Sequence, residues 1–382
     1  MIYLDYAATT PVDDKVIAEM NRYLGINDNF GNPASSTHLF GLNAKVAVQQ
    51  ARVRIAEKLN ALPEEIIFTS GATESDNLAI KGLMQFQHKN GRHLITSMTE
   101  HKAILDSCQA LEKQGFEVTY IKPNADGSLN LDDIKNAIRQ DTTLVSIMHV
   151  NNETGVVHDI DTIAQLAKAH GLYFHTDAAQ SFGKLPIDVQ KTPIDLISLA
   201  SHKLYGPKGI VALYVRRKPR VRLVEQISGG KHEMGLRSGT LPTHQIAGFA
   251  KAVELMNDDE QTRIDGLRAQ LIASLQMLDG IHINQAALYL PNIISITIDH
   301  VDSESLMASC PELAFSAGSA CTSTAIAPSH VLAAMGLSNE QAHNTIRLSL
   351  GRYTTIKDVE QTVSSLAAQI QRIRQLSPNW ST

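Results

Sequence analysis

The sequence predicts an α/β fold, with a large domain built on a mainly parallel β-sheet and a smaller α+β domain after it. Short apolar runs alternate with amphipathic stretches from about residue 36 to residue 215, a pattern typical of βαβ units. The pattern changes after Gly239. The chain of 382 residues is also too long for a single hydrophobic core, so two or three domains are expected.

Seven short apolar runs predict the strands of the large domain: Glu65–Thr69, His93–Thr96, Glu117–Ile121, Leu144–Val150, Leu172–His175, Leu196–Leu199 and Gly209–Val215. Amphipathic stretches predict helices between most of them: Thr37–Leu59, Thr73–His88, Lys102–Gln114, Leu131–Ile138 and Ile160–Ala169. In a sheet of this kind ligands bind at the carboxyl ends of the strands, so the functional residues are expected there.

The second part of the chain begins with a long amphipathic stretch, from His244 to about Leu278, that is suited to bridging two domains. The elements expected after it are a strand at Asn292–Ile298, a loop of small residues near 316–324, and helices near Pro328–Met335 and Ile356–Gln375. We therefore expect a large domain over residues 15–250 and a small domain over residues 251–382, joined by an N-terminal segment, residues 1–14.

The composition is that of a soluble globular protein, with 43% hydrophobic and 19% charged residues. A net charge of −5 gives no general attraction to nucleic acid or to anionic lipid. The local exception is Arg216–Arg222, which reads either as a solvated turn or as a docking patch for an acidic protein. The sequence contains no signal peptide and no apolar run long enough to span a bilayer.

The three cysteines, Cys108, Cys310 and Cys321, cannot all pair within one chain, and no metal-ligand spacing is present. A reducing, cytoplasmic location and no metal of its own are therefore expected. Cys321 stands in a loop of small residues, Ser316–Thr324, where a thiol can move into a site and attack. We predict that Cys321 is a nucleophile and that the other two cysteines contribute to packing.

Two polar clusters follow neighbouring predicted strands, and they carry an acid and an amine. Asp177 comes after the run that contains Leu172–His175, and Lys203 comes after Leu196–Leu199, with Gly206 and Pro207 fixing the chain beyond it. If the two strands end side by side, a carboxylate and an amine lie at one rim of the sheet. Pyridoxal 5'-phosphate (PLP) needs this pair, an amine for its Schiff base and an acid on its pyridinium nitrogen.

Other segments at strand ends suit the same cofactor. Gly71 permits a tight turn before a helix whose first N–H groups, those of Ala72 and Thr73, would cradle a phosphate. His101 could stack on a planar ring or carry a proton, and Asn152 could donate to a phenolate oxygen. Taken singly, each segment also reads as an ordinary helix cap, surface residue or turn.

Two further segments carry cations. Arg237–Thr240 could meet a phosphate, and Arg347 and Arg352 bracket a short apolar run. An arginine at the entrance of a strand can hold the α-carboxylate of a substrate through a bidentate fork. The alternative for each arginine is a surface ion pair.

With these motifs in order, the chain resembles the cysteine desulfurases of the NifS/IscS type, within the class V aminotransferase-like family of PLP enzymes. The resemblance runs from Tyr3 to Pro378, and it includes the segments 31–35, 69–77, 99–101, 149–155, 237–240, 316–323 and 346–352 as well as those around Asp177 and Lys203. It implies a PLP-dependent transferase of fold type I that acts as a homodimer, with L-cysteine as substrate and a sulfur-acceptor protein as partner.

The resemblance also implies roles for individual residues. Lys203 forms the Schiff base, His101 stacks on the ring and carries a proton, and Cys321 takes the sulfur of L-cysteine as a persulfide, leaving L-alanine. Cofactor contacts are implied for Ala72, Thr73, Asn152, Asp177, Gln180, His202 and, from the other subunit, Thr240. Substrate contacts are implied for Arg347, Asn152 and Asn32. The sulfur would serve iron–sulfur cluster assembly or another sulfur-transfer route, and Cys321 could contact an iron–sulfur cluster transiently during the transfer.

The sequence departs from the family in two ways. The serine that usually stands three residues before the Schiff-base lysine is Ala200 here, and a serine follows at Ser201. We expect the contact of Ser201 with the phosphate to be weak or lost. The chain ends soon after Trp380, whereas IscS-like members have a longer tail for the scaffold protein, so the acceptor stays open. The alternatives are a selenocysteine lyase or related β-eliminating enzyme, and an inactive interaction scaffold.

Overall fold

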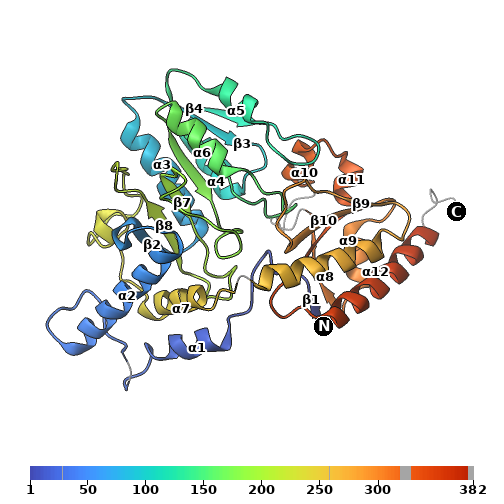
Figure 1. The fold of residues 1–382 in the computed structure, drawn as a ribbon, viewed down its shortest axis with the longest axis horizontal. Helices are drawn as coiled ribbons and strands as arrows, with labels where there is room; N and C mark the ends of the chain where they lie inside the picture. The colour runs from blue at the N-terminus through green and yellow to red at the C-terminus, as the bar shows by residue number, and fades with distance from the viewer. Residues whose placement is uncertain (28, 258, 319–327, 377–382) are drawn as a thin grey trace.

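The computed structural model describes residues 1–27, 29–257, 259–318 and 328–376. A seven-stranded sheet forms the centre of the large part, in the order β2-β8-β7-β6-β5-β3-β4 (Figure 1). The five strands from β7 to β4 run parallel, and β8 is antiparallel to both of its neighbours. The strands are β2 (Ile66–Thr69), β3 (His93–Ser97), β4 (Glu117–Ile121), β5 (Thr142–Ser146), β6 (Tyr173–Asp177), β7 (Leu196–Ser198) and β8 (Val211–Val215).

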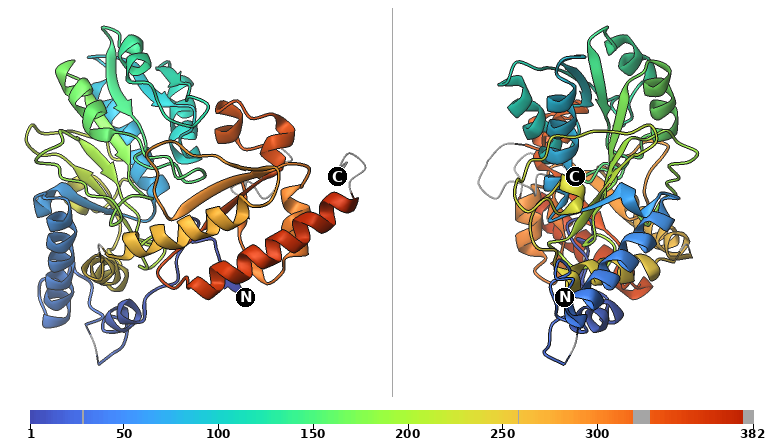
Figure 2. Two further views of the ribbon diagram at one scale, coloured as in Figure 1. Left: turned by 45° about the vertical axis from the view of Figure 1, so that its right-hand side comes forward. Right: turned by 90° about the vertical axis from the view of Figure 1, so that its left-hand side faces the viewer.

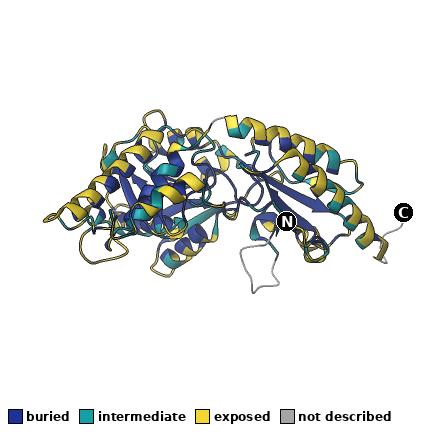
Figure 3. Cartoon of the chain, turned by 90° about the horizontal axis from the view of Figure 1, so that it is seen from below, coloured by how far each residue is buried: buried dark blue, intermediate teal, exposed yellow. Residues whose placement is uncertain are grey.

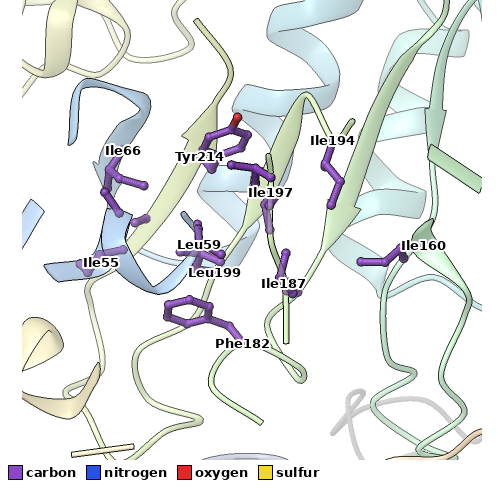
Figure 4. Packing of buried hydrophobic residues seen from close by; sticks show 14 of the residues in the cluster. Ile55, Leu59, Ile66, Ile160, Phe182, Ile187, Ile194, Ile197, Leu199 and Tyr214 are labelled. Carbon is purple, nitrogen blue, oxygen red and sulfur yellow. The ribbon is translucent and has the colours of Figure 1, made fainter. Parts of the chain in front are cut away.

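Helices cover both faces of this sheet. One hydrophobic cluster joins the sheet to α2 (Leu39–Lys58), α5 (Leu131–Ala137), α6 (Ile160–Ala169) and α7 (Thr243–Glu254), and α1 (Asp14–Asn21) packs on α7. A second cluster joins the opposite face to α3 (Ala72–Gln87) and α4 (Lys102–Glu112). Figure 4 shows part of the first cluster, which includes Leu59, Ile197 and Tyr214.

The two faces follow from the period of two along each strand. Leu144 and Leu196 belong to the cluster under α3 and α4, whereas the next residues, Val145 and Ile197, belong to the cluster on the other face. A strand covered by helices on both faces must be apolar on both, and every residue of β5 and β7 is buried (Figure 3). The same alternation decides which face each polar residue at a strand end will occupy.

The small part has its own sheet and its own core. Four antiparallel strands lie in the order β12-β13-β10-β9: β9 (Ile281–Ile283), β10 (Ile293–Ile298), β12 (Ser316–Ala317) and β13 (Thr345–Ser349). Two long helices, α8 (Asp259–Leu275) and α12 (Ile356–Leu376), run side by side and share a hydrophobic cluster with this sheet (Figure 2). The remaining short elements are β1 (Ile2–Tyr3), α9 (Ser303–Ser309), β11 (Leu313–Ala314), α10 (His330–Ala334) and α11 (Asn339–His343).

The N-terminal segment reaches the small sheet, since Leu4 lies in the core of the small part and β1 pairs with β11. The separate cores support the predicted division near residue 250, and the domain bounds themselves stay a prediction. The α/β class and the parallel centre of the sheet are confirmed. No helix of the described residues is long and apolar enough to cross a membrane, and within the same residues no group of three or more His, Cys, Asp or Glu could hold a metal ion.

Most predicted elements are present with shifted ends. β4 and α6 have the predicted bounds, whereas β5 ends at Ser146 rather than at Val150, although Ile147 and His149 still donate to the backbone of β6. The stretch from His244 to Leu278 is not one bridge but two helices, α7 and α8, since Leu255 ends the first. The elements that sequence reasoning missed are short or lie in the small part, including β1, α1, β9 and β13.

Candidate active site

The site is centred on the carboxyl ends of β6 and β7. These strands pair in parallel, and Asp177, the last residue of β6, lies opposite Ser198, the last residue of β7. The chain beyond Ser198 leads to Lys203, and the charges of Asp177 and Lys203 both act on the imidazole of His101. The prediction that the two strands end side by side is confirmed, and the acid and the amine lie at one rim of the sheet.

Hydrogen bonds hold the residues that follow β6. Asp177 is buried, and its Oδ1 accepts a bond of 2.8 Å from the backbone N–H of Ala179. Gln180 donates through Nε2 to the carbonyl of Ala7 at 2.9 Å, which ties the N-terminal segment to the site. Its Oε1 is buried and has no hydrogen-bond partner among the described residues. Oε1 can only accept, so the group that this amide can offer to a ligand oxygen is the second hydrogen of Nε2.

An anion cradle lies where β2 leads into α3. Gly71 precedes the helix in an extended conformation, and no described side chain caps the first turn. The N–H groups of Ala72 and Thr73 belong to that turn, where the α-helical hydrogen bonds have not yet begun. A Cβ atom placed on Gly71 would meet no described atom within 4 Å. Free N–H groups facing open space at the positive end of a helix suit a phosphate.

Arg237, the other phosphate candidate, is bound to a protein carboxylate. Its Nε lies 2.9 Å from Glu74 Oε1 in α3. Burial raises the pKa of Glu74, but hydrogen bonds from Arg237 and Ser70 outweigh it and leave that pKa below its ordinary value. Arg237 therefore braces the start of α3 through an ion pair, the alternative considered from the sequence.

Two histidines at the site are held neutral. His101 caps α4, with Nδ1 accepting from the N–H of Ala103 at 3.2 Å, and burial lowers its pKa. An accepting Nδ1 leaves the proton on Nε2, which makes that atom the donor. For His202, burial and then the charge of Lys203 lower the pKa to about 4, and its Nδ1 lies 3.1 Å from the hydroxyl of Thr9.

Arg347 lies in the middle of β13 rather than at its entrance. It is 4% exposed. Its Nη1 donates to the carbonyl of Asn152 at 2.8 Å, and its Nη2 donates to Asp5 Oδ1 at 2.8 Å. Its Nε is buried and has no partner in the described part of the chain. The predicted neighbours Arg347 and Asn152 are thus in contact, and Asp5 fixes the guanidinium.

A glycine turn places Asn152. Asn151 accepts from the N–H groups of Glu153 and Thr154 at 2.9 Å each, and it donates to the carbonyl of Thr99 at 2.9 Å. Gly155 completes the turn at φ +76°, and a Cβ there would lie 2.9 Å from the carbonyl oxygen of Ile293. Only glycine fits this position without displacing a neighbour.

Three predicted site residues, Ser201, Thr240 and Asn32, make no side-chain hydrogen bond with another predicted site residue within the described part of the chain. The Ser201 hydroxyl is buried against Gly206, and it has no hydrogen-bond partner among the described residues. Thr240 and Asn32 are exposed. Asn32 lines a different cavity of about 420 Å³, together with Arg52 and His232. Neither Lys203 nor Asp177 lines that cavity.

The cysteines fall into two groups. Cys321 lies outside the described residues, so its placement stays a prediction. Cys108 and Cys310 are free thiols buried in hydrophobic clusters. Burial raises the pKa of both, that of Cys310 to about 11. Because a protonated thiol is a poor nucleophile, these two cysteines contribute packing, as predicted.

Sequence reasoning missed three polar residues near the rim. Asp5 holds Arg347, Asp76 is fully buried in α3, and Lys184 donates to the carbonyl of Gln180 at 3.0 Å. Burial lowers the pKa of Lys184 to about 7. The helical period gave a signal for Asp76, because the residues three and four positions beyond it, Ala79 and Ile80, are both fully buried.

Taken together, these features fit a flat aromatic phosphate such as PLP. The start of α3 offers N–H donors to a phosphate, the rim offers an acid and an amine on neighbouring strands, and Gln180 offers the second hydrogen of its amide. A neutral imidazole at His101 can stack on a ring and can give or take a proton.

Comparisons with known proteins agree with this description. Residues 2–362 match the family described as Aminotransferase class-V. The cysteine desulfurase IscS of Shewanella baltica (strain OS155) is 52% identical over 385 residues, which cover 99% of this chain and 95% of the relative. The IscS of Salmonella paratyphi B (strain SPB7) is 51% identical over 386 residues, with the same coverage.

Solved structures are similar over nearly the whole chain. A NifS-like protein is 33% identical with a TM-score of 0.90, and the match covers 97% of this chain and 99% of that one. A structure described as SspA in complex with cysteine is 42% identical with a TM-score of 0.83, covering 93% of this chain and 100% of the other.

Proposed function

The chain belongs to the aminotransferase class-V family, and from this premise we propose that it is a PLP-dependent cysteine desulfurase. Its substrate is L-cysteine, and its products are L-alanine and a persulfide on Cys321. The observation that carries the proposal is the parallel pairing of β6 and β7, which brings the approaches to Lys203 and the carboxylate of Asp177 to one rim. The IscS relatives at 51–52% identity support the same reaction.

PLP, when bound, supplies an aldehyde for the amine of its lysine and an electron-accepting ring that stabilises negative charge at the substrate Cα. The residues that would hold it are those of the rim. The N–H groups of Ala72 and Thr73 would take the phosphate with help from His202, and Asp177 would accept from the ring nitrogen. Asn152 and the second Nε2 hydrogen of Gln180 would donate to the phenolate oxygen. The Ser201 hydroxyl packs against Gly206 and adds little to the phosphate site.

Lys203 and His101 move protons. The Nζ atom of Lys203 takes the proton from the substrate Cα and returns it, which requires an amine that is neutral at the moment of transfer. His101 carries its proton on Nε2, because Nδ1 accepts from the N–H of Ala103. A neutral histidine in this tautomer can donate to the substrate sulfur or receive a proton from an approaching thiol.

Arg347 and Asn152 orient the substrate. The guanidinium is already fixed by Asp5 and by the carbonyl of Asn152. Nε has no partner among the described residues, Nη1 keeps a second hydrogen, and Nη2 otherwise lies only at a long 3.4 Å from the Ser316 hydroxyl. The guanidinium can therefore add a fork to a carboxylate without breaking its bonds to Asp5 and Asn152. This pre-organised cation binds the α-carboxylate of L-cysteine and so fixes which bonds of the substrate face Lys203.

Cys321 receives the sulfur. Its thiolate attacks the sulfur of L-cysteine as the Cβ–S bond breaks, and the substrate carbon gains a proton, so that L-cysteine and one thiol give L-alanine and one persulfide. The persulfide then passes to an acceptor thiol on a partner protein, for iron–sulfur assembly or another sulfur-transfer route.

We also propose a cytoplasmic homodimer. Thr240 and Asn32 are exposed, and the chain near Asn32 carries exposed apolar residues, including Ile26 and Phe40. Burial of these side chains against a second copy would bring Thr240 to the phosphate and Asn32 to the substrate of the other subunit. The cavity that Asn32 lines contains neither Lys203 nor Asp177, which supports an arrangement in which each site needs both copies.

The test compares L-alanine and sulfide production from L-cysteine, in the presence of a thiol reductant, by the wild type and by Cys321→Ser. The cysteine reaction should collapse in the variant while the yellow cofactor is retained. Cys310→Ser is the matched control, because that thiol is buried and its pKa is high. Equal activity in wild type and Cys321→Ser would mean a β-eliminating lyase, and no bound PLP in the wild type would mean an inactive scaffold.

A further inference from the structure

A layer of polar side chains lies beneath the rim, between the sheet and α3. Ser146, His175 and Ser198 come from the neighbouring strands β5, β6 and β7, and all three are at most 1% exposed. Each follows a residue of the cluster on the other face, namely Val145, Phe174 and Ile197. The period of two therefore turns this layer toward α3, on the same face as Asp177.

Hydrogen bonds join the layer into a chain centred on His175. Its Nδ1 lies 2.8 Å from the Ser146 hydroxyl, and its Nε2 lies 3.2 Å from the Ser198 hydroxyl. Burial lowers the pKa of His175 to about 3, so its ring is neutral. A neutral imidazole offers one donor and one acceptor, and each serine hydroxyl can serve in either role.

Asp76 of α3 points into this layer. It is 0% exposed, and its Oδ1 lies 3.8 Å from His175 Nε2. Neither of its oxygens has a partner of hydrogen-bond geometry among the described residues, although Ser198 is near enough to act on its pKa as a donor. An ionised carboxylate without partners at full burial is very costly, whereas a protonated one is a neutral group that can donate.

The acids around Asp76 act in the same direction as its burial. Burial raises its pKa well above the ordinary value, and the negative charge of Asp177 raises it further. Glu100 adds to the rise, while Ser198 and Lys203 act against it. Burial also raises the pKa of Glu100 itself. The charges of Lys203 and Asp177 both act on Asp76, and the proposed function needs the negative charge on Asp177 alone.

We propose that Asp76 is a protonated positioning residue, which donates into the Ser198–His175–Ser146 chain and keeps the negative charge of the site on Asp177. This role rests on the proposed function, in which the negative charge of Asp177 is needed by the ring nitrogen of PLP. Asp177 is the acceptor for the ring nitrogen of PLP, and a second carboxylate behind it would draw Lys203 and the ring away from it. Asp76 supplies a hydrogen bond there without supplying a charge.

The first test needs no cofactor. The infrared spectrum of the full chain labelled with [4-¹³C]aspartate, taken at about pH 8, should contain the shifted C=O band of a protonated aspartic acid, because an ordinary aspartate has a pKa of about 3.9. Asp76→Asn should remove the band, and Asp106→Asn, at an exposed aspartate of α4, should leave it. Absence of the band from the wild type would overturn the proposal. Survival of the band in Asp76→Asn would overturn it as well, because the protonated acid would then be another aspartate.

The second test measures PLP affinity. Asp76→Asn keeps a neutral donor of similar size and should bind PLP within about threefold of wild type, whereas Asp76→Leu removes the donor and should bind about tenfold more weakly. An equal loss in both variants would mean that the charge of Asp76 is needed, and no loss in Asp76→Leu would mean that its donor is not. Either result overturns the proposal. A wild type that binds no PLP would refute the proposed function, while the infrared result would still decide the protonation of Asp76.

Discussion

The sharpest prediction concerns Arg347, because its contacts allow a magnitude to be stated. The buried guanidinium makes two bonds of 2.8 Å, to Asp5 Oδ1 and to the carbonyl of Asn152. A hydrogen bond with a charged partner contributes about 1.5–3 kcal/mol, so Arg347→Gln should lower the free energy of unfolding by about 3 kcal/mol. The lower end of the range is used since the Asp5 side chain is 21% exposed and water can solvate it in the variant.

The same change should weaken substrate binding. Loss of a fork on the substrate carboxylate, worth about 2.7 kcal/mol, lowers kcat/KM for L-cysteine about 100-fold, mainly through KM. Arg347→Lys keeps a charge but not the fork, so we expect a loss of about tenfold. The measurement is a steady-state assay of L-alanine at several cysteine concentrations, with chemical unfolding of each variant.

The neighbouring arginine provides the matched control. Arg352 pairs with Asp13 at 2.9 Å and with Glu260 at 2.8 Å, so Arg352→Gln should destabilise the protein and leave KM unchanged. An unchanged KM in Arg347→Gln would refute the assignment of the carboxylate to Arg347. A raised KM in Arg352→Gln instead would move that assignment to Arg352.

Three further predictions test the cradle and two buried titratable groups. Gly71→Ala should weaken PLP binding at least about tenfold, because the added Cβ enters the space proposed for the phosphate. It should not lower the Tm of the cofactor-free protein, because that space is open. Gly155→Ala, by contrast, should lower the free energy of unfolding by about 2 kcal/mol, because the backbone there has φ +76°. Burial raises the pKa of Glu153 to about 7. The contribution of this carboxyl to stability is therefore fully present at low pH and is lost as the pH rises through about 7. The Tm of the wild type should accordingly fall relative to that of Glu153→Gln between about pH 4.5 and 7. Burial lowers the pKa of His158 to about 4; its stabilisation is present above about pH 6.5 and is lost as the pH falls toward 4, a loss that His158→Gln should reduce.

Each of these predictions has a contrary outcome that can be observed. Unchanged PLP affinity in Gly71→Ala would mean that the phosphate does not sit at the start of α3. Parallel Tm curves for wild type and Glu153→Gln would show that Glu153 titrates normally, and Glu225→Gln, at an exposed position, gives the baseline. His170→Gln, also exposed, is the baseline for His158→Gln.

Sequence reasoning succeeded where one local signal decides the outcome. The strand bounds at Glu117–Ile121 and the pairing implied by the clusters at Asp177 and Lys203 needed only apolar runs and their ends. It was less successful in the small part, where strands of two or three residues such as β9 and β12 carry no period of their own. Those strands exist because the long strands β10 and β13 offer them hydrogen bonds, which is a property of the assembled sheet.

The site shows the same division. Residues whose type and position at the end of a strand indicate a function, such as Lys203 and Asp177, could be selected from the sequence. The roles of Asp5 and Asp76 could not, because each depends on a partner far away in the chain: Asp5 on Arg347, and Asp76 on His175. An aspartate in an amphipathic helix ordinarily faces solvent, and the helical period that places Asp76 on the buried face of α3 does not identify His175 as its neighbour.

The packing of α3 across the sheet gives a reason for the placement of the polar layer. The cluster under α3 and α4 is apolar along the middle of the strands, at Leu94, Leu144 and Leu196, and becomes polar two residues later, at Ser146 and Ser198. A wholly apolar layer would leave Asp177 at the edge of a medium in which its charge is unfavourable. A layer of hydroxyls and one neutral imidazole supplies dipoles instead, so the sheet can carry a charged acid at its rim and still be closed by a helix.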